Sequence, residues 1–179
     1  MKKVILTTTA AILIALGSFG QNKELNKSYI FKTYEEYQQN KPSVILDHEK
    51  GDKIKYAFPA GLQTRLKIKT NNSVTICKPG DIWGYEKQGI LYRQFADYKQ
   101  KELGWEFKYY FRVIQKKEIV IYAVRHTEAG SYLGARNYTS YYYSLDLNSE
   151  IKKINEKNLQ SDFKDKPELR NVLNEYRSR

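Results

Sequence analysis

Few residues that could support imidazole or thiol chemistry are present, and they are scattered; carboxylates are plentiful, but the sequence predicts no pairing of them. The 179-residue chain contains two histidines, His48 and His126, and one cysteine, Cys77. Each histidine has a carboxylate within two residues, but a metal site usually needs three or four convergent ligands. A lone cysteine is most often a small buried apolar residue, although distance along the chain does not exclude a dyad in the fold. We therefore predict no catalytic residue, no metal and no cofactor.

Aromatic side chains favour binding over catalysis. The chain contains 16 tyrosines and two tryptophans, and Trp83, Tyr85 and Tyr92 fall within one short segment. Exposed aromatic rings stack on sugars and anchor interfaces because they combine a large rigid area with a polar edge. The alternative is packing between strands, which these residues also favour. We predict Trp83, Tyr85 and Tyr92 as ligand-binding residues.

A stripe of cations is the second candidate binding feature. Arg65, Lys67 and Lys69 alternate with Leu66 and Ile68, so a strand there places three positive charges on one face at steps of about 7 Å. The chain carries a formal charge of +11. This stripe predicts an anionic glycan, lipopolysaccharide or another envelope protein as partner, and no nucleic acid, for an exported chain. The alternative is a solvated face, charged to discourage aggregation.

The N-terminus has the layout of a secretory signal peptide. Met1-Lys2-Lys3 is cationic, Val4–Leu16 is largely apolar, and the small residues Ser18 and Gly20 precede Gln21. The apolar run is shorter than the roughly 20 residues that span a bilayer. We expect an exported protein, periplasmic or extracellular, with no transmembrane helix in the mature chain.

Apolar residues at every second position predict an antiparallel sheet through the middle of the chain. The strands at 105–113 and 119–124 should form a central hairpin, with a loop over 126–137. The predicted strands cover residues 53–58, 65–69, 74–76, 82–85, 90–95, 105–113, 119–124 and 138–145.

Helix signals occur near both ends of the mature chain. Thr33 caps a short helix over 33–40, and Asn155 caps another over 156–163. A third helix begins at Asp165-Lys166-Pro167-Glu168. Its apolar stripe should cover the sheet, including the tyrosines crowded on the strand at 138–145. That stripe comprises Leu169, Val172, Leu173 and Tyr176. The sequence predicts an α+β fold: mainly antiparallel β-sheet, with a short N-terminal helix and C-terminal helices packed on it. Residues 1–20 form the signal peptide, and residues 21–179 form a single α+β domain.

Three segments resemble short exported proteins of uncharacterised function from Bacteroidetes bacteria. They are the Phe31–Ser43 stretch FKTYEEYQQNKPS, the pair IWGY at Ile82–Tyr85 and GILYR at Gly89–Arg93, and the Leu145–Leu169 stretch. The resemblance implies export in a bacterium with two membranes and a small β-rich fold. It implies no catalytic residue, cofactor or substrate.

These features together favour a non-catalytic binding or interaction module of the periplasm or cell surface. One alternative is a small hydrolase acting on an envelope or dietary polymer, which needs a polar cleft where His48, His126 or Cys77 meets a carboxylate. The other is a structural accessory subunit of an envelope complex.

The signal peptide makes a direct prediction about the mature chain. Mass spectrometry of the protein recovered from the envelope or the medium should show a chain that begins near Gln21, because cleavage follows the small residues. An intact Met1 on the folded, exported protein would contradict this prediction.

Overall fold

The computed structural model describes residues 25–57, 65–78, 80–94, 99–100, 105–106, 110–128 and 136–177. These residues form mostly antiparallel strands, with two helices close to the C-terminal end. The predicted α+β class with a mainly antiparallel sheet is therefore confirmed. The proposed signal peptide, residues 1–20, lies outside the described residues and stays a prediction. No helix in the described part of the chain is long and apolar enough to cross a bilayer.

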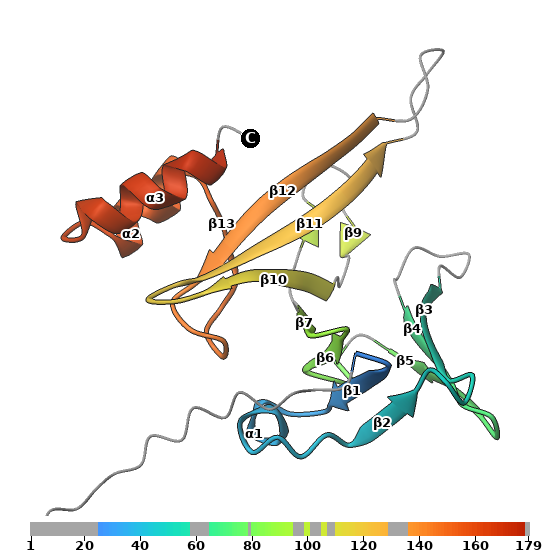
Figure 1. Cartoon of the computed structure of the whole chain (residues 1–179). Helices are drawn as coiled ribbons and strands as arrows, with labels where there is room; N and C mark the ends of the chain where they lie inside the picture. Colours follow the sequence, from blue (N-terminus) through green and yellow to red (C-terminus); the bar gives the residue numbers. More distant parts are fainter. Residues whose placement is uncertain are drawn as a thin grey trace, which may run out of the picture.

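The strands form one large sheet and two small ones (Figure 1). The large sheet has the order β13-β12-β11-β10-β7-β6-β1-β2, the small sheet has the order β3-β4-β5, and β8 pairs with β9. The strands are β1 (Lys27–Phe31), β2 (Val44–Asp47), β3 (Lys53–Ala57), β4 (Arg65–Lys69), β5 (Val74–Cys77), β6 (Gly84–Lys87), β7 (Ile90–Gln94), β8 (Lys99–Gln100), β9 (Trp105–Glu106), β10 (Tyr110–Lys116), β11 (Val120–Glu128), β12 (Arg136–Ser144) and β13 (Lys152–Lys153). The helices are α1 (Tyr34–Gln38), α2 (Glu156–Asp162) and α3 (Pro167–Arg177).

One row of paired residues crosses seven strands of the large sheet. Residues paired across neighbouring strands point to the same face, because the pleats of the strands are in phase. We call the face that carries this row the groove face. The row runs Val44, Ile30, Tyr85, Tyr92, Arg112, Ala123, Tyr141.

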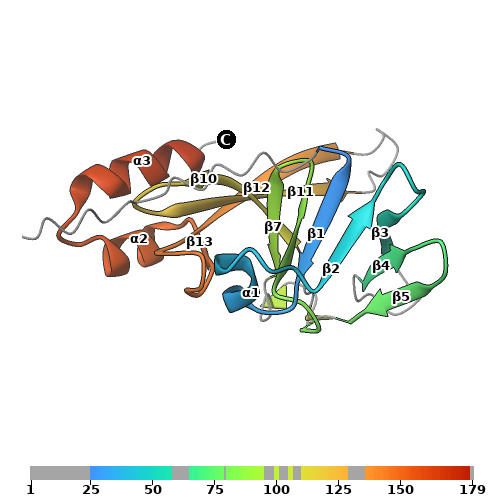
Figure 2. The ribbon, with the colours of Figure 1, turned by 60° about the horizontal axis from the view of Figure 1, so that its bottom comes forward.

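Two separate layers cover the two ends of the groove face. The small sheet packs Leu66 and Ile68 of β4 against Ile30 and Tyr85 of the large sheet. The helices α2 and α3 cover Ile121 and other residues of β11 and β12. Figures 1 and 2 show the helices and the small sheet at opposite ends of the large sheet. The middle of the groove face lies between these two layers.

The C-terminal helices begin as the sequence predicts. Asn155 caps α2, and its side chain accepts a hydrogen bond from the Asn158 amide at 2.9 Å. Leu169 and Leu173 of α3 are buried. Val172 lies on the predicted apolar stripe but is 40% exposed, so that part of the prediction is wrong. The stripe that contacts the sheet is narrower than its four apolar residues suggest.

The same helices supply the cover that the tyrosine-rich strand requires. The Tyr141 ring meets Tyr176 of α3 at 5.2 Å, and the Tyr143 ring meets Phe163 at 5.4 Å. Tyr142 points to the opposite face and packs on Phe111. The expectation that α3 covers part of this strand is confirmed.

The strand predicted over 105–113 is divided. Trp105–Glu106 pairs with β8, whereas Tyr110–Lys116 forms β10 and pairs with β7 and β11. The loop predicted over 126–137 is too long at both ends, because β11 extends to Glu128 and β12 begins at Arg136. Alternation alone does not reveal which neighbour a strand pairs with, and polar residues extend these two strands.

A tight turn fixes the register that the row depends on. Gln88 and Gly89 have φ values of 52° and 73°, and they join β6 to β7. Two-residue turns with positive φ at both positions match the twist of antiparallel strands. The turn therefore sets Tyr85 opposite Tyr92.

Helix α3 allows a matched test of the packing. Leu173→Ala should lower the free energy of unfolding by about 2–5 kcal/mol, because it removes a fully buried side chain. Val172→Ala, one residue away and 40% exposed, should cost much less. Urea unfolding of both variants measures this, and equal small effects would show that α3 is not part of the core.

Candidate functional site

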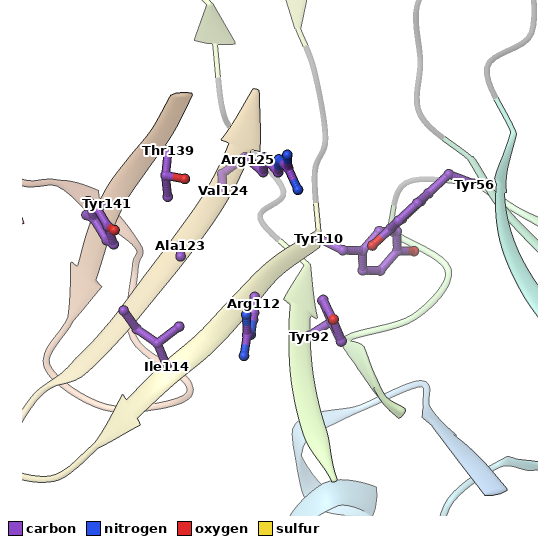
Figure 3. Close-up of a pocket in the computed structure, with 10 residues that line it drawn as sticks. All are labelled: Tyr56, Tyr92, Tyr110, Arg112, Ile114, Ala123, Val124, Arg125, Thr139 and Tyr141. Carbon is purple, nitrogen blue, oxygen red and sulfur yellow. The ribbon is translucent and has the colours of Figure 1, made fainter. Parts of the chain in front are cut away.

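A groove occupies the middle of the groove face, between the small sheet and the helices (Figure 3). Its volume is about 540 Å³. Strands β7, β10, β11 and β12 of the large sheet supply most of it, and β3 supplies one tyrosine. The lining residues are Tyr56, Tyr92, Tyr110, Arg112, Ile114, Ala123, Val124, Arg125, Thr139 and Tyr141.

Two arginines give the groove its charge. Arg112 belongs to the row that crosses the sheet, and Arg125 lies two residues beyond Ala123 on the same face, opposite Thr139. Both side chains are exposed. Neither forms an ion pair with another described residue, and no Asp or Glu lines the groove. Among the described residues, the groove therefore carries two positive charges that no lining carboxylate neutralises.

A cluster of tyrosines forms the wall toward the small sheet. The Tyr56 hydroxyl of β3 hydrogen-bonds to the Tyr85 hydroxyl of β6. The Tyr110 ring lies 6.2 Å from the Tyr56 ring and 5.4 Å from the Tyr85 ring. Burial raises the pKa of Tyr56 to about 12, and burial also raises the pKa values of Tyr85 and Tyr110. All three are therefore neutral at physiological pH.

The Tyr110 hydroxyl is buried and has no hydrogen-bond partner among the described residues. A buried hydroxyl without a partner is costly, and most buried polar groups in native proteins are paired. Tyr110 also lines the groove, so this unpaired hydroxyl belongs to a residue of the groove wall.

The three aromatic residues predicted from the sequence lie in three different settings. Tyr92 lines the groove and stacks on Tyr85 at 4.8 Å. Tyr85 is only 3% exposed and lies among the other tyrosines, so it supports the groove without lining it. Trp83 does not line the groove either; it packs against Tyr34 and Tyr37 of α1.

A second cavity of about 460 Å³ lies beside Trp83. Arg93, 8% exposed, lies 6.0 Å from the Trp83 ring and donates to the Tyr122 hydroxyl at 3.1 Å. Lys32 and Arg93 line this cavity together with the carboxylates of Glu35 and Glu150, so its charges are balanced. It lacks the one-sided charge of the groove.

The cation stripe lies on the small sheet, away from the groove. Lys67 and Lys69 are exposed, Arg65 is half-buried, and Leu66 and Ile68 are buried, which confirms the predicted alternation. The role of Arg65, Lys67 and Lys69 in ligand binding stays a prediction. The stripe and Trp83 lie apart in the structure. Trp83 and Tyr92 also lie on different surfaces.

His48 meets a hydroxyl and a backbone carbonyl. Its Nδ1 lies 2.9 Å from the Asp52 carbonyl oxygen, and its Nε2 lies 2.8 Å from the Ser28 hydroxyl. Since a carbonyl only accepts, Nδ1 donates to it and Nε2 accepts from Ser28. Ser28 is fully buried and His48 is half-buried, so the serine hydroxyl is not exposed as a nucleophile. The side chain of His126 lies outside the described residues.

Cys77 is also in a setting that does not favour reactivity. It is buried, and burial raises the pKa of its thiol, which disfavours the nucleophilic thiolate. In the described part of the chain, no three His, Cys, Asp or Glu side chains gather as metal ligands. Neither His48 nor Cys77 lines the groove.

Sequence reasoning missed most of the groove. Arg112 and Tyr110 were visible only as members of a long alternating strand, and Arg125 and Thr139 fell in or beside a predicted loop or strand end. The sequence does contain Arg112 and Arg125 near two strands that are consecutive in the chain. Their proximity in space depends on the pairing register of those strands. Comparison with protein-family models, with curated proteins and with solved structures finds no match to this chain.

The tyrosine wall predicts a specific alkaline weakening. Folding raises the pKa of Tyr56 from its ordinary value near 10 to about 12. Its contribution to stability is therefore complete below about pH 10 and is lost as the pH rises toward 12, because the unfolded state deprotonates first. Tyr56→Phe should lower the free energy of unfolding at neutral pH, since it leaves the Tyr85 hydroxyl without its partner. It should also reduce the fall in the free energy of unfolding between about pH 10 and pH 12.

Urea unfolding of the wild-type protein and Tyr56→Phe, below and above the ordinary tyrosine pKa, measures both effects. Tyr29→Phe is a control on β1, away from the wall. Identical pH profiles for the wild-type protein and Tyr56→Phe would contradict the prediction.

Proposed function

We propose that the protein is an exported, non-catalytic binding module of the periplasm or cell surface, and that its groove binds an anionic glycan. The observation that carries this proposal is the lining of the groove: its described residues include four tyrosines and two arginines, and none of them has a carboxylate, imidazole or thiol. The signal peptide predicted for residues 1–20 and the resemblance to exported bacterial proteins support the location.

The charge of the groove selects the sign of the ligand. Arg112 and Arg125 face the same groove from neighbouring strands, and neither is neutralised by a described carboxylate. A guanidinium binds a carboxylate through two parallel hydrogen bonds, which gives orientation as well as affinity. A ligand with several carboxylates or sulfates along its length could pair with both guanidinium groups on this side of the sheet.

The tyrosines select the shape of the ligand. Tyr92 and Tyr141 lie at two sides of the arginines, and Tyr110 adds a third aromatic residue to the lining (Figure 3). Aromatic rings with polar edges contact the apolar faces of sugar rings and hydrogen-bond at their rims. The combination fits a sugar acid better than an inorganic anion or an apolar molecule.

Calorimetric titration with an oligogalacturonide and with a neutral galactose oligosaccharide of the same length tests this function. The wild-type protein should bind the acidic oligosaccharide and not the neutral one. Arg112→Gln/Arg125→Gln should weaken binding by about tenfold or more, because each charged hydrogen bond contributes about 1.5–3 kcal/mol. Arg112→Lys/Arg125→Lys should keep part of the affinity, since it keeps the charge and loses the paired geometry.

A control variant separates the groove from net charge. Lys157→Gln/Lys164→Gln removes the same charge from exposed positions in and beside α2, and should leave binding unchanged. Equal affinities for the acidic and neutral oligosaccharides, or equal losses in the arginine and lysine variants, would contradict the proposed function.

A further inference from the structure

The outer face of the small sheet carries like charges directly opposite one another. Lys53 of β3 pairs with Lys69 of β4, and Lys55 pairs with Lys67. All four are exposed, and none forms an ion pair with another described residue. Like charges directly across two strands destabilise a sheet. The fold keeps two such pairs side by side, next to Arg65.

Exposed aliphatic side chains border these lysines on the same face. Val74 of the edge strand β5 pairs with Lys69, and Ile76 pairs with Lys67. They are 54% and 48% exposed. The inner face of the same sheet is buried against the large sheet through Ile54, Leu66 and Ile68. We name the outer face of Lys53, Lys55, Arg65, Lys67, Lys69, Val74 and Ile76 the lysine face.

We infer that the lysine face docks the protein on an anionic lipid bilayer. Each lysine near a negatively charged lipid surface adds to adsorption, and the attraction between the sheet and the surface relieves the repulsion between the paired lysines. Long lysine stems let the charge reach the headgroups while their methylenes lie against apolar surface. Val74 and Ile76 add the apolar contact that strengthens adsorption to the headgroup boundary.

The exposed aliphatic pair is what favours a bilayer over a soluble polyanion. A soluble acidic polymer offers charge but no apolar layer, so Val74 and Ile76 would stay unused. The lysine face is also separate from the groove, because it is the side of β3 and β4 turned away from the large sheet. A docked protein therefore keeps its groove open, and the two binding events are independent.

Sedimentation with lipid vesicles tests this inference. The wild-type protein should bind vesicles of phosphatidylglycerol and phosphatidylcholine at low salt, and should not bind vesicles of phosphatidylcholine alone. Changing Lys53, Lys55, Lys67 and Lys69 to Gln together should weaken vesicle binding by about tenfold or more. The thermal midpoint of this variant should stay equal or rise, because both repulsive pairs are removed.

Two further variants make the outcome specific. A charge-matched control changes four exposed lysines elsewhere, Lys117, Lys153, Lys157 and Lys164, to Gln and should retain most of the vesicle binding. Val74→Thr/Ile76→Thr keeps the β-branched shape, and should weaken vesicle binding while leaving retention on heparin unchanged.

Three results would overturn the inference. The first is a wild-type protein that does not bind the anionic vesicles. The second is an equal loss in the two fourfold lysine variants, which would make net charge the cause. The third is vesicle binding that is insensitive to Val74→Thr/Ile76→Thr, which would make the face a site for soluble polyanions. The groove variant Arg112→Gln/Arg125→Gln should bind vesicles normally, so this test stands apart from the glycan test.

Discussion

The pairing register of the large sheet is the constraint on which the rest of the structure depends. It places one row of side chains on a single face, from Val44 at one edge to Tyr141 near the other. The ends of that row are apolar or aromatic and take a covering layer, whereas Arg112 near its middle is charged and stays uncovered. The small sheet and the C-terminal helices each cover only one end of the large sheet. The groove is the uncovered part between them. A slip of one residue in β10 would send Arg112 to the opposite face.

The hydroxyl contact between Tyr56 and Tyr85 connects this register to both proposed binding surfaces, the groove and the lysine face. Tyr56 points inward from β3, because it pairs with Leu66 and shares its buried face. The same alternation turns Lys55 and Lys67 outward. Docking of the small sheet therefore completes one wall of the groove and presents the lysine face to solvent in one step. Losing the tyrosine contact would loosen both surfaces together.

The sequence predicts local structure well here and predicts assembly poorly. The alternation of Arg65, Lys67 and Lys69 against apolar residues, the Asn155 cap and the burial of Leu173 all follow from short-range patterns, and the structure has all three. The groove depends on which strands become neighbours. Arg112 and Arg125 lie 13 positions apart in sequence and meet only through the β10–β11 register, which includes an irregularity between Val113 and Gln115. No local pattern encodes that proximity. Trp83 lies just before β6 and packs on α1, so it does not share the surface of Tyr92.

We propose that the uncovered middle of the sheet is the ligand site. Backbone amide shifts measured by NMR during titration with an oligogalacturonide test it most directly. We expect the perturbed amides to cluster in β7, β10, β11 and β12 around Arg112 and Arg125, and to saturate at a common affinity. Shifts confined to the small sheet, or spread over the lysines of the whole surface without saturation, would contradict it.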